Sequence, residues 1–188
     1  MTRDEALGLV HKHTKNPNLI KHMLAVEAGM RAYAARYGVD AETWGIAGLV
    51  HDFDYEANPN PDRLPNEQHP SSGAAILRAE GWPEDVVEAV LGHADYTGVP
   101  RTSLMSKALY AVDELTGLIV AVALVRPSRK LADVDLAAIR KKWKEKSFAA
   151  GVERQAIVRG AEELGVPLDE HIGVVLGAMQ AVAPDLGL

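Results

Sequence analysis

Apolar residues recur along most of the chain at the spacing of an α-helix, and the strict alternation of a β-strand is nearly absent. The clearest segment begins at Pro17 and runs to about Tyr37, where Gly38 is suited to end it. Asp40 then has the position of an N-cap for a helix in AETWGIAGLVHDF. Further helices are predicted at roughly 70–80, 83–93, 103–125, 135–148, 152–164 and 167–182. The pattern predicts an all-α protein with irregular helix packing.

One loop interrupts the helical pattern, the asparagine- and proline-rich stretch EANPNPDRLPNEQHP at residues 56–70. A residue that precedes proline is disfavoured in a helix, so these X-Pro steps keep the stretch irregular. No repeat, low-complexity tract or linker divides the chain. Its 188 residues suit one hydrophobic core, and we expect a single domain over residues 1–188.

Composition and charge narrow the function classes. The net charge is −6, which does not attract polyanions at long range, so no stable nucleic-acid complex is expected. The absence of cysteine excludes disulfides, thiolate nucleophiles and cysteine-ligated zinc. The N-terminus has no apolar run of signal-peptide length, and the longest apolar run, GLIVAVALV, is about half of a membrane span. We therefore expect a cytoplasmic protein without a membrane attachment.

Histidines and aspartates supply the candidate chemistry. In GLVHDFDYE an apolar run ends in His51 and Asp52, and adjacent polar groups there are costly to bury unless they share a partner such as a metal ion. Asp113 lies in a long apolar helical segment, so its carboxylate must be paired or coordinated. Imidazole with carboxylate suits iron, manganese, cobalt, nickel or zinc. The six candidate ligands are His22, His51, Asp52, His69, His93 and Asp113.

Taken singly, each of these side chains has an ordinary alternative. His22 is typical of a hydrogen-bonded residue at the rim of a core, and a His-Asp pair occurs often by chance. His69 precedes Pro70 at a helix start, and His93 suits the C-terminal end of a helix dipole. The ordered set H…HD…H…H…D, with Asp113 on an apolar helix, favours a metal site. Six side chains give each of two ions about three ligands and leave positions open for water and substrate.

The ordered set resembles the HD superfamily of metal-dependent phosphohydrolases, in particular its six-ligand dinuclear branch of HDIG type. The segments that carry the resemblance are LIKHMLAVE, AGLVHDFDYE, EQHPSSGAAIL, AVLGHADYTG and SKALYAVDELTG. The resemblance implies one HD-type domain, with a helical core at about 18–125 and a helical extension at 126–188. It implies a first metal at His22, His51, Asp52 and Asp113, with Asp52 bridging to a second metal at His69 and His93.

The sequence departs from several branches of that superfamily. Many relatives continue the HD pair as Ile-Gly-Lys, whereas this chain continues as Phe53-Asp54-Tyr55. The cyclic-di-GMP phosphodiesterase branch has a doubled histidine and a Gly-Tyr-Pro signature, whereas this chain reads GHADYTGVP. HD enzymes that cleave nucleotides such as diadenosine tetraphosphate carry six ligands in the same order. The resemblance to them covers the core and does not extend to the substrate.

The resemblance implies hydrolysis of a phosphomonoester or phosphodiester by a metal-bound hydroxide, with one or two divalent metal ions and a small phosphorylated substrate, above all a nucleotide. The candidate catalytic residues are Asp52 as the bridge, Asp54 to orient water or to support a ligand from behind, and Lys107 as a phosphate contact. The candidate substrate-binding residues are Tyr96, Arg129 and Lys130. A solvated surface position is the alternative for the polar residues other than the ligands.

The ligand set leaves other functions open. Mixed-valent di-iron oxygenases of the HD superfamily use the same ligand order, so ligands alone do not separate a hydrolase from an oxygenase. The hydrolase is favoured because that chemistry dominates the superfamily. A non-catalytic, metal-stabilised signalling module is the least favoured function, since it has no use for open coordination sites. Metal identity, substrate and homo-oligomer formation are not specified by the sequence.

Overall fold

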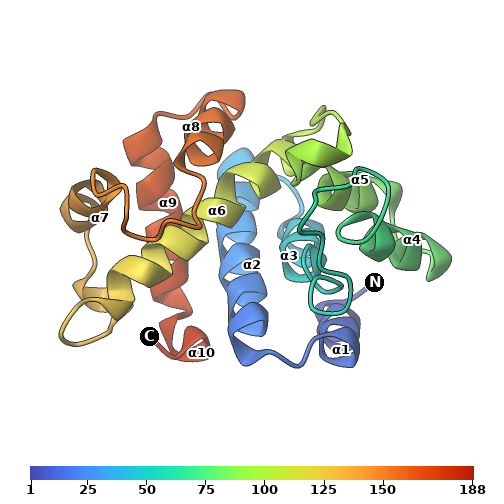
Figure 1. The fold of residues 1–188 in the computed structure, drawn as a ribbon, viewed down its shortest axis with the longest axis horizontal. Coiled ribbons are helices and arrows are strands. Elements are labelled where there is room, and N and C mark those ends of the chain that lie inside the picture. Colours follow the sequence, from blue (N-terminus) through green and yellow to red (C-terminus); the bar gives the residue numbers. More distant parts are fainter.

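Two long helices cross at the centre of the computed structural model, which describes all 188 residues (Figure 1). They are α2 (Pro17–Tyr37) and α6 (Leu104–Leu124). On one side lie α1 (Arg3–His13), α3 (Ala41–Val50), α4 (Ser71–Ala79) and α5 (Glu84–Gly92). On the other lie α7 (Leu136–Trp143), α8 (Arg154–Glu163), α9 (Leu168–Ala181) and α10 (Ala183–Leu186). There are no strands, and the predicted all-α class is confirmed.

The ends of α2 and the start of α3 follow from local sequence. The Asn16 side chain caps α2 by accepting the Asn18 N–H, Pro17 occupies the first turn, and Gly38 ends the helix with a φ of 66°. Glycine suits this left-handed conformation because it has no Cβ. Asp40 caps α3 as predicted, but α3 ends at Val50, so the segment that follows, with the HD pair, forms a turn.

Two helices lie outside the predicted set, and one predicted helix is shorter than expected. Helix α1 begins with a capping box in which the Thr2 hydroxyl accepts the Glu5 N–H and the Glu5 carboxylate accepts the Thr2 N–H. The Thr-x-x-Glu spacing is a sequence signal for that start. Helix α10 is only a single turn at the C-terminus. Helix α7 ends at Trp143, short of the predicted 148.

One continuous cluster of buried apolar side chains joins the two sides of the fold. It includes Tyr33 and Leu118 on the central helices, and Ile139 and Ile172 from the segment beyond residue 125. None of the helices combines the length and hydropathy that a membrane crossing requires.

Helix α8 packs unusually close to α6. A Cβ placed on Gly160 would lie 2.5 Å from the Ala111 Cα, so no residue larger than glycine fits there without a shift of backbone. Ala111 is two residues before Asp113 on α6. The close approach therefore brings α8 beside the segment of α6 that carries the candidate ligand.

Candidate metal centre

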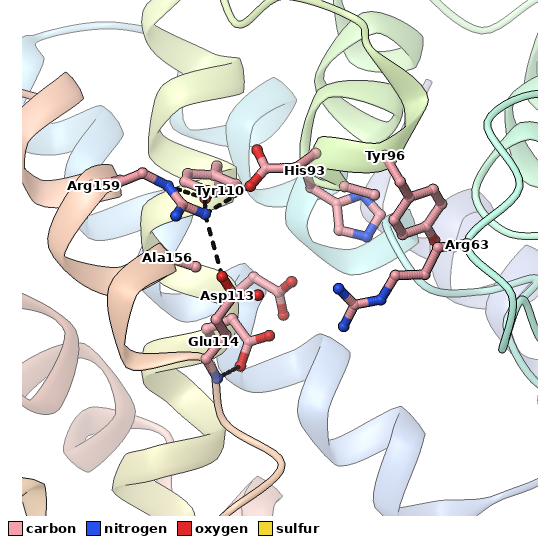
Figure 2. Close-up of a pocket in the computed structure, with 11 residues that line it drawn as sticks. Arg63, His93, Tyr96, Tyr110, Asp113, Glu114, Ala156 and Arg159 are labelled. Atoms are coloured by element: carbon pink, nitrogen blue, oxygen red, sulfur yellow. Dashed lines mark hydrogen bonds and ion pairs between the residues drawn. The ribbon is translucent and has the colours of Figure 1, made fainter.

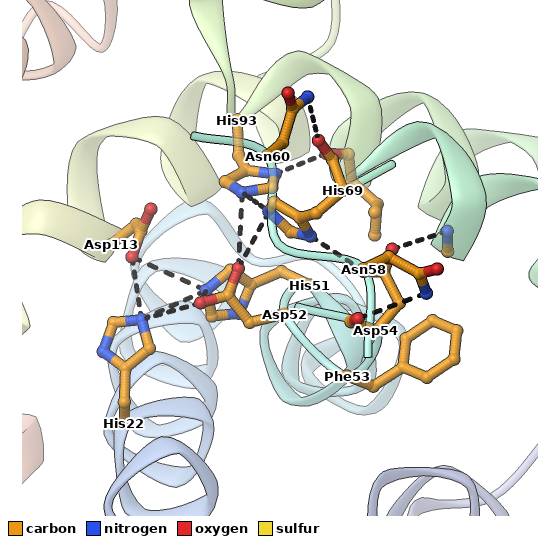
Figure 3. A network of polar contacts seen from close by, with 12 residues as sticks. His22, His51, Asp52, Phe53, Asp54, Asn58, Asn60, His69, His93 and Asp113 are labelled. Carbon is orange, nitrogen blue, oxygen red and sulfur yellow. Dashed lines mark hydrogen bonds and ion pairs between the residues drawn. The ribbon is translucent and has the colours of Figure 1, made fainter. Parts of the chain in front are cut away.

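All six predicted ligands converge on one point of the fold (Figure 3). They come from different elements: α2, the turn after α3, the end of the loop before α4, the C-cap of α5, and the middle of α6. In that order the side chains are His22, His51 with Asp52, His69, His93 and Asp113. They form two groups, one of His22, His51 and Asp113 and the other of Asp52, His69 and His93.

In the first group the ring nitrogens and a carboxylate oxygen surround one small space. The Nε2 atoms of His22 and His51 are 3.2 Å apart. Asp113 Oδ1 lies 3.0 Å from His22 Nε2 and 3.5 Å from His51 Nε2. Asp52 Oδ2 lies 3.6 Å and 3.4 Å from the same two nitrogens. Four donor atoms are therefore available to one cation.

The second group uses the other oxygen of the same aspartate. The Nε2 atoms of His69 and His93 are 3.3 Å apart. Asp52 Oδ1 lies 3.2 Å from His69 Nε2 and 3.6 Å from His93 Nε2. Each oxygen of Asp52 thus faces a different histidine pair, which is the arrangement of a carboxylate that bridges two ions.

The protein fixes the tautomer of the three buried histidines of this centre. In each, Nδ1 faces a group that accepts a hydrogen bond, so the proton sits on Nδ1 and the Nε2 lone pair points into the centre. The acceptors are the Gly48 carbonyl for His51 (2.8 Å), the Val90 carbonyl for His93, and Asp54 Oδ1 for His69 (2.8 Å).

His22 is oriented in the same way through a hydroxyl. Thr116 donates its hydroxyl hydrogen to the Asp113 carbonyl, 2.8 Å away. Its oxygen is then the acceptor for His22 Nδ1 at 3.2 Å. All four Nε2 atoms therefore direct a lone pair inward. They form two close pairs, His22 with His51 and His69 with His93.

This donor set fits divalent cations. Two unprotonated nitrogens at 3.2–3.3 Å repel each other unless positive charge lies between them. Two carboxylates add negative charge at the same place, and imidazole with carboxylate suits first-row metals. The residues present would hold one ion in each group, with Asp52 shared.

The charges of the centre show in the pKa values of its members. Burial raises the pKa of Asp52, but the adjacent histidines outweigh burial and hold it well below its usual range. Burial lowers the pKa of His69, but Asp52 and Asp54 outweigh it and raise the pKa to about 9. Without a metal the centre therefore attracts positive charge, here as protons.

Asp54 holds a ligand and does not face the reacting atoms. It is fully buried, and its Oδ2 accepts the Gly73 N–H at 2.8 Å while Oδ1 faces His69 Nδ1. A Cβ on Gly73 would lie 2.7 Å from the Asp54 carboxyl carbon, so the site requires glycine there. Of the two roles predicted for Asp54, support of a metal ligand fits this geometry, because both of its oxygens are occupied behind His69.

A cleft of about 520 Å³ opens beside the centre (Figure 2). His93 and Asp113 form part of its wall, and the N-terminal part of α8 forms another part. Burial and the neighbouring Asp113 raise the pKa of Glu114, which also lines the cleft, to about 6. The other lining residues are Arg63, Ala94, Asp95, Tyr96, Tyr110, Glu153, Ala156 and Arg159.

The predicted substrate contacts are only partly brought to this cleft. Tyr96 lines it and donates its hydroxyl to the His69 carbonyl at 3.0 Å. Lys107 does not line it and lies near Glu163, whose pKa it helps to lower. Arg129 and Lys130 are exposed and follow the end of α6, and the helix rises about 16 Å between Asp113 and its last residue, Leu124. The length of α6 carries them away from the cleft.

Two arginines of the cleft were not predicted from the sequence. Arg63 lies in the asparagine- and proline-rich loop, and Arg159 lies on α8. Neither belongs to a recognisable motif. Arg63 is six residues before His69 in an irregular loop, and Arg159 is 46 residues after Asp113. Only the close packing of α8 on α6 and the path of the loop bring them there.

All six candidate ligands lie within a segment that matches a known family. A family model described as "HD domain" matches residues 19–123, more than half of the chain. Ribonuclease Y from two strains of Thermus thermophilus is 33% identical over 92 residues. That alignment covers 48% of this chain but only 15% of the relative. No solved structure matches the chain.

Proposed function

The chain belongs to the HD-domain family of metal-dependent phosphohydrolases, and we propose that it hydrolyses a small phosphomonoester or phosphodiester, with a nucleotide as the leading substrate class. The observation that carries the proposal is the position of Asp52. Its two oxygens face two separate histidine pairs at 3.2–3.6 Å. A carboxylate shared in this way suits the two-metal centres that catalyse displacement at phosphorus.

The residues of the chain have distinct parts in this reaction. Two divalent cations, when bound, would activate a water for in-line attack and neutralise the phosphate oxygens. Asp52 sets the separation of the two binding positions. Asp54 and Thr116 hold His69 and His22 with Nε2 directed inward. His93 and Asp113 border the cleft, so a phosphate that enters it reaches both groups of ligands.

The size of the cleft and the charge of the protein support a small substrate. About 520 Å³ is within the usual range of small-molecule sites. A net charge of −6 does not favour a long polyanion. Ribonuclease Y is named for action on RNA, which is a phosphodiester, but the chain spans about 15% of that relative's length. An RNA oligonucleotide therefore belongs in the substrate panel beside nucleotides.

The test begins with metal analysis of protein purified without chelator. Phosphate release is then measured with aryl phosphates, nucleoside mono- and diphosphates, dinucleoside polyphosphates and a short RNA. We expect hydrolysis that EDTA abolishes and divalent metal restores, and that Asp52→Asn lacks. Absence of hydrolysis with every metal in the series would contradict the proposal. Oxygen consumption without phosphate release would select the oxygenase.

A further inference from the structure

The two arginines of the cleft differ in their partners. Arg159 donates to Asp95 Oδ2 at 2.7 Å and to the Tyr110 hydroxyl at 2.6 Å, and it lies 3.4 Å from a Glu153 oxygen. Its charge is already neutralised within the protein. The Arg63 guanidinium makes no hydrogen bond or ion pair, and Figure 2 shows it directed into the cleft toward Asp113 and Glu114.

The loop that carries Arg63 is tied to a metal ligand by one buried side chain. The amide nitrogen of Asn60, a residue only 7% exposed, lies 2.8–3.1 Å from the carbonyls of Leu64, Glu67 and His69, which share its two hydrogens. The backbone carbonyl of Asn60 accepts the Arg63 backbone N–H at 3.2 Å. The same residue therefore fixes the turn at Arg63 and the backbone of His69, so that the backbone of Arg63 keeps a set position relative to the centre.

The backbone of Arg63 has a strained conformation that the surrounding loop enforces. Its φ is 53°, in the left-handed region that residues other than glycine rarely adopt. Strain of this kind persists where surrounding structure enforces it, as the Asn60 hydrogen bonds do here. Tyr96, which also borders the cleft, reinforces the loop by donating to the His69 carbonyl at 3.0 Å.

We propose that Arg63 binds the phosphate group of the substrate at the mouth of the metal centre; this assignment rests on the proposed function. The acidic side chains of the cleft, among them Glu114 and Glu153, repel a phosphate. Arg159 is already paired with Asp95. Arg63 is then the one cation of the cleft that is free to pair with the incoming anion. Its planar guanidinium also suits two oxygens of one phosphate.

The direct test is steady-state kinetics of Arg63→Ala and Arg63→Lys with the substrate found in the panel. Loss of a charge-assisted contact should raise KM about tenfold or more. Lysine should recover part of the loss because it keeps the charge but not the paired geometry. Metal content should stay unchanged, since Arg63 contacts no ligand. A loss of metal in Arg63→Ala would assign the residue a structural role and overturn the proposal.

Arg129→Ala provides a matched comparison. Arg129 is also an exposed arginine with positive φ, 54° against 53° for Arg63, but it lies outside the cleft. Its replacement by alanine subtracts the same charge at the same backbone conformation. We expect KM within about twofold of wild type. If the loss of affinity follows Arg129 and not Arg63, the sequence-based hypothesis is right and the proposal is wrong.

A binding measurement separates this inference from the proposed reaction. Calorimetry with inorganic phosphate is done on metal-loaded wild type, Arg63→Ala and Arg129→Ala. Weaker binding in Arg63→Ala alone supports the assignment even if no phosphoester is hydrolysed, in which case only the reaction is wrong. Equal phosphate affinity in all three proteins, together with normal hydrolysis, overturns the role of Arg63 and leaves the reaction intact.

Discussion

Buried histidines serve two regions of this molecule in opposite ways. At the metal centre each ring has a supporting acceptor at Nδ1, and its Nε2 faces another Nε2 and a carboxylate of the candidate ligand set. At the junction of α2, α6 and α9, His171 has a protein partner for both nitrogens. The two regions therefore contain the same side chain at similar burial, but only one leaves lone pairs for a ligand.

The partners of His171 define its tautomer. Nε2 is 2.9 Å from the Ala111 carbonyl, which can only accept, so the proton is on Nε2. The Tyr33 hydroxyl, 2.6 Å from Nδ1, then donates to that nitrogen. Burial lowers the pKa of His171 to about 4, whereas the carboxylates of the centre raise that of His69 to about 9. Burial alone thus does not identify a metal ligand. The sign of one is an Nε2 that faces another Nε2, with no donor to pair with its lone pair.

The largest effect is expected from Asp52→Asn, which removes the negative charge that both histidine pairs share. Loss of a residue that only orients a ligand typically costs about 10–100-fold in metal affinity or activity. A shared ligand should cost more, and metal content should fall at both positions. Metal analysis beside phosphate release tests this. Retention of two metals with full activity would show that Asp52 does not bridge.

His171 should instead control stability in acid. Its folded pKa of about 4 lies below the usual 6.5, so unfolded chains bind the proton first as the pH falls. Stability is complete above about pH 6.5 and declines toward pH 4, by about 2 kcal/mol between pH 7 and pH 5 from this residue. Urea unfolding of wild type and His171→Gln at several pH values measures the difference. The variant should be less stable at pH 7 and less sensitive to acid; an identical pH slope in both proteins would contradict this.

Asp54→Asn should affect one half of the centre. The amide can accept from His69 or from Gly73, but its nitrogen cannot replace the second acceptor. We expect about 10–100-fold weaker binding of the second metal, with the first metal retained. Metal titration resolves the two positions by stoichiometry. Equal weakening of both would show that the two groups are not independent.

The smallest effect is expected from Thr116→Val, which acts on the first metal position through His22. Valine has nearly the same shape but offers no acceptor to His22 Nδ1, which is partly exposed and can turn to water. The affinity of the first metal should fall by less than about tenfold, because a hydroxyl acceptor is weaker than the carboxylate of Asp54. A larger loss here than in Asp54→Asn would reverse the ranking of the two supports.

Local sequence determined most of the helices and the identity of the candidate ligands. Capping residues such as Asp40 and Gly38 act within one turn, so their effect can be predicted from the local sequence. The HD pair and an aspartate on an apolar helix indicate a metal because a buried charge requires a partner. The ligand order H…HD…H…H…D was therefore sufficient to predict the family, which the match over residues 19–123 shows.

Only the tertiary structure decided which polar residues support the centre and which face the cleft. Asp54 and Arg63 come from the same irregular stretch, yet one is fully buried behind His69 and the other is directed into the cleft. Arg159 reaches the cleft because Gly160 lets α8 approach α6. Arg129 follows the ligand helix in sequence, but that helix is rigid and carries it away. Such placements depend on contacts between distant segments, which no local pattern encodes.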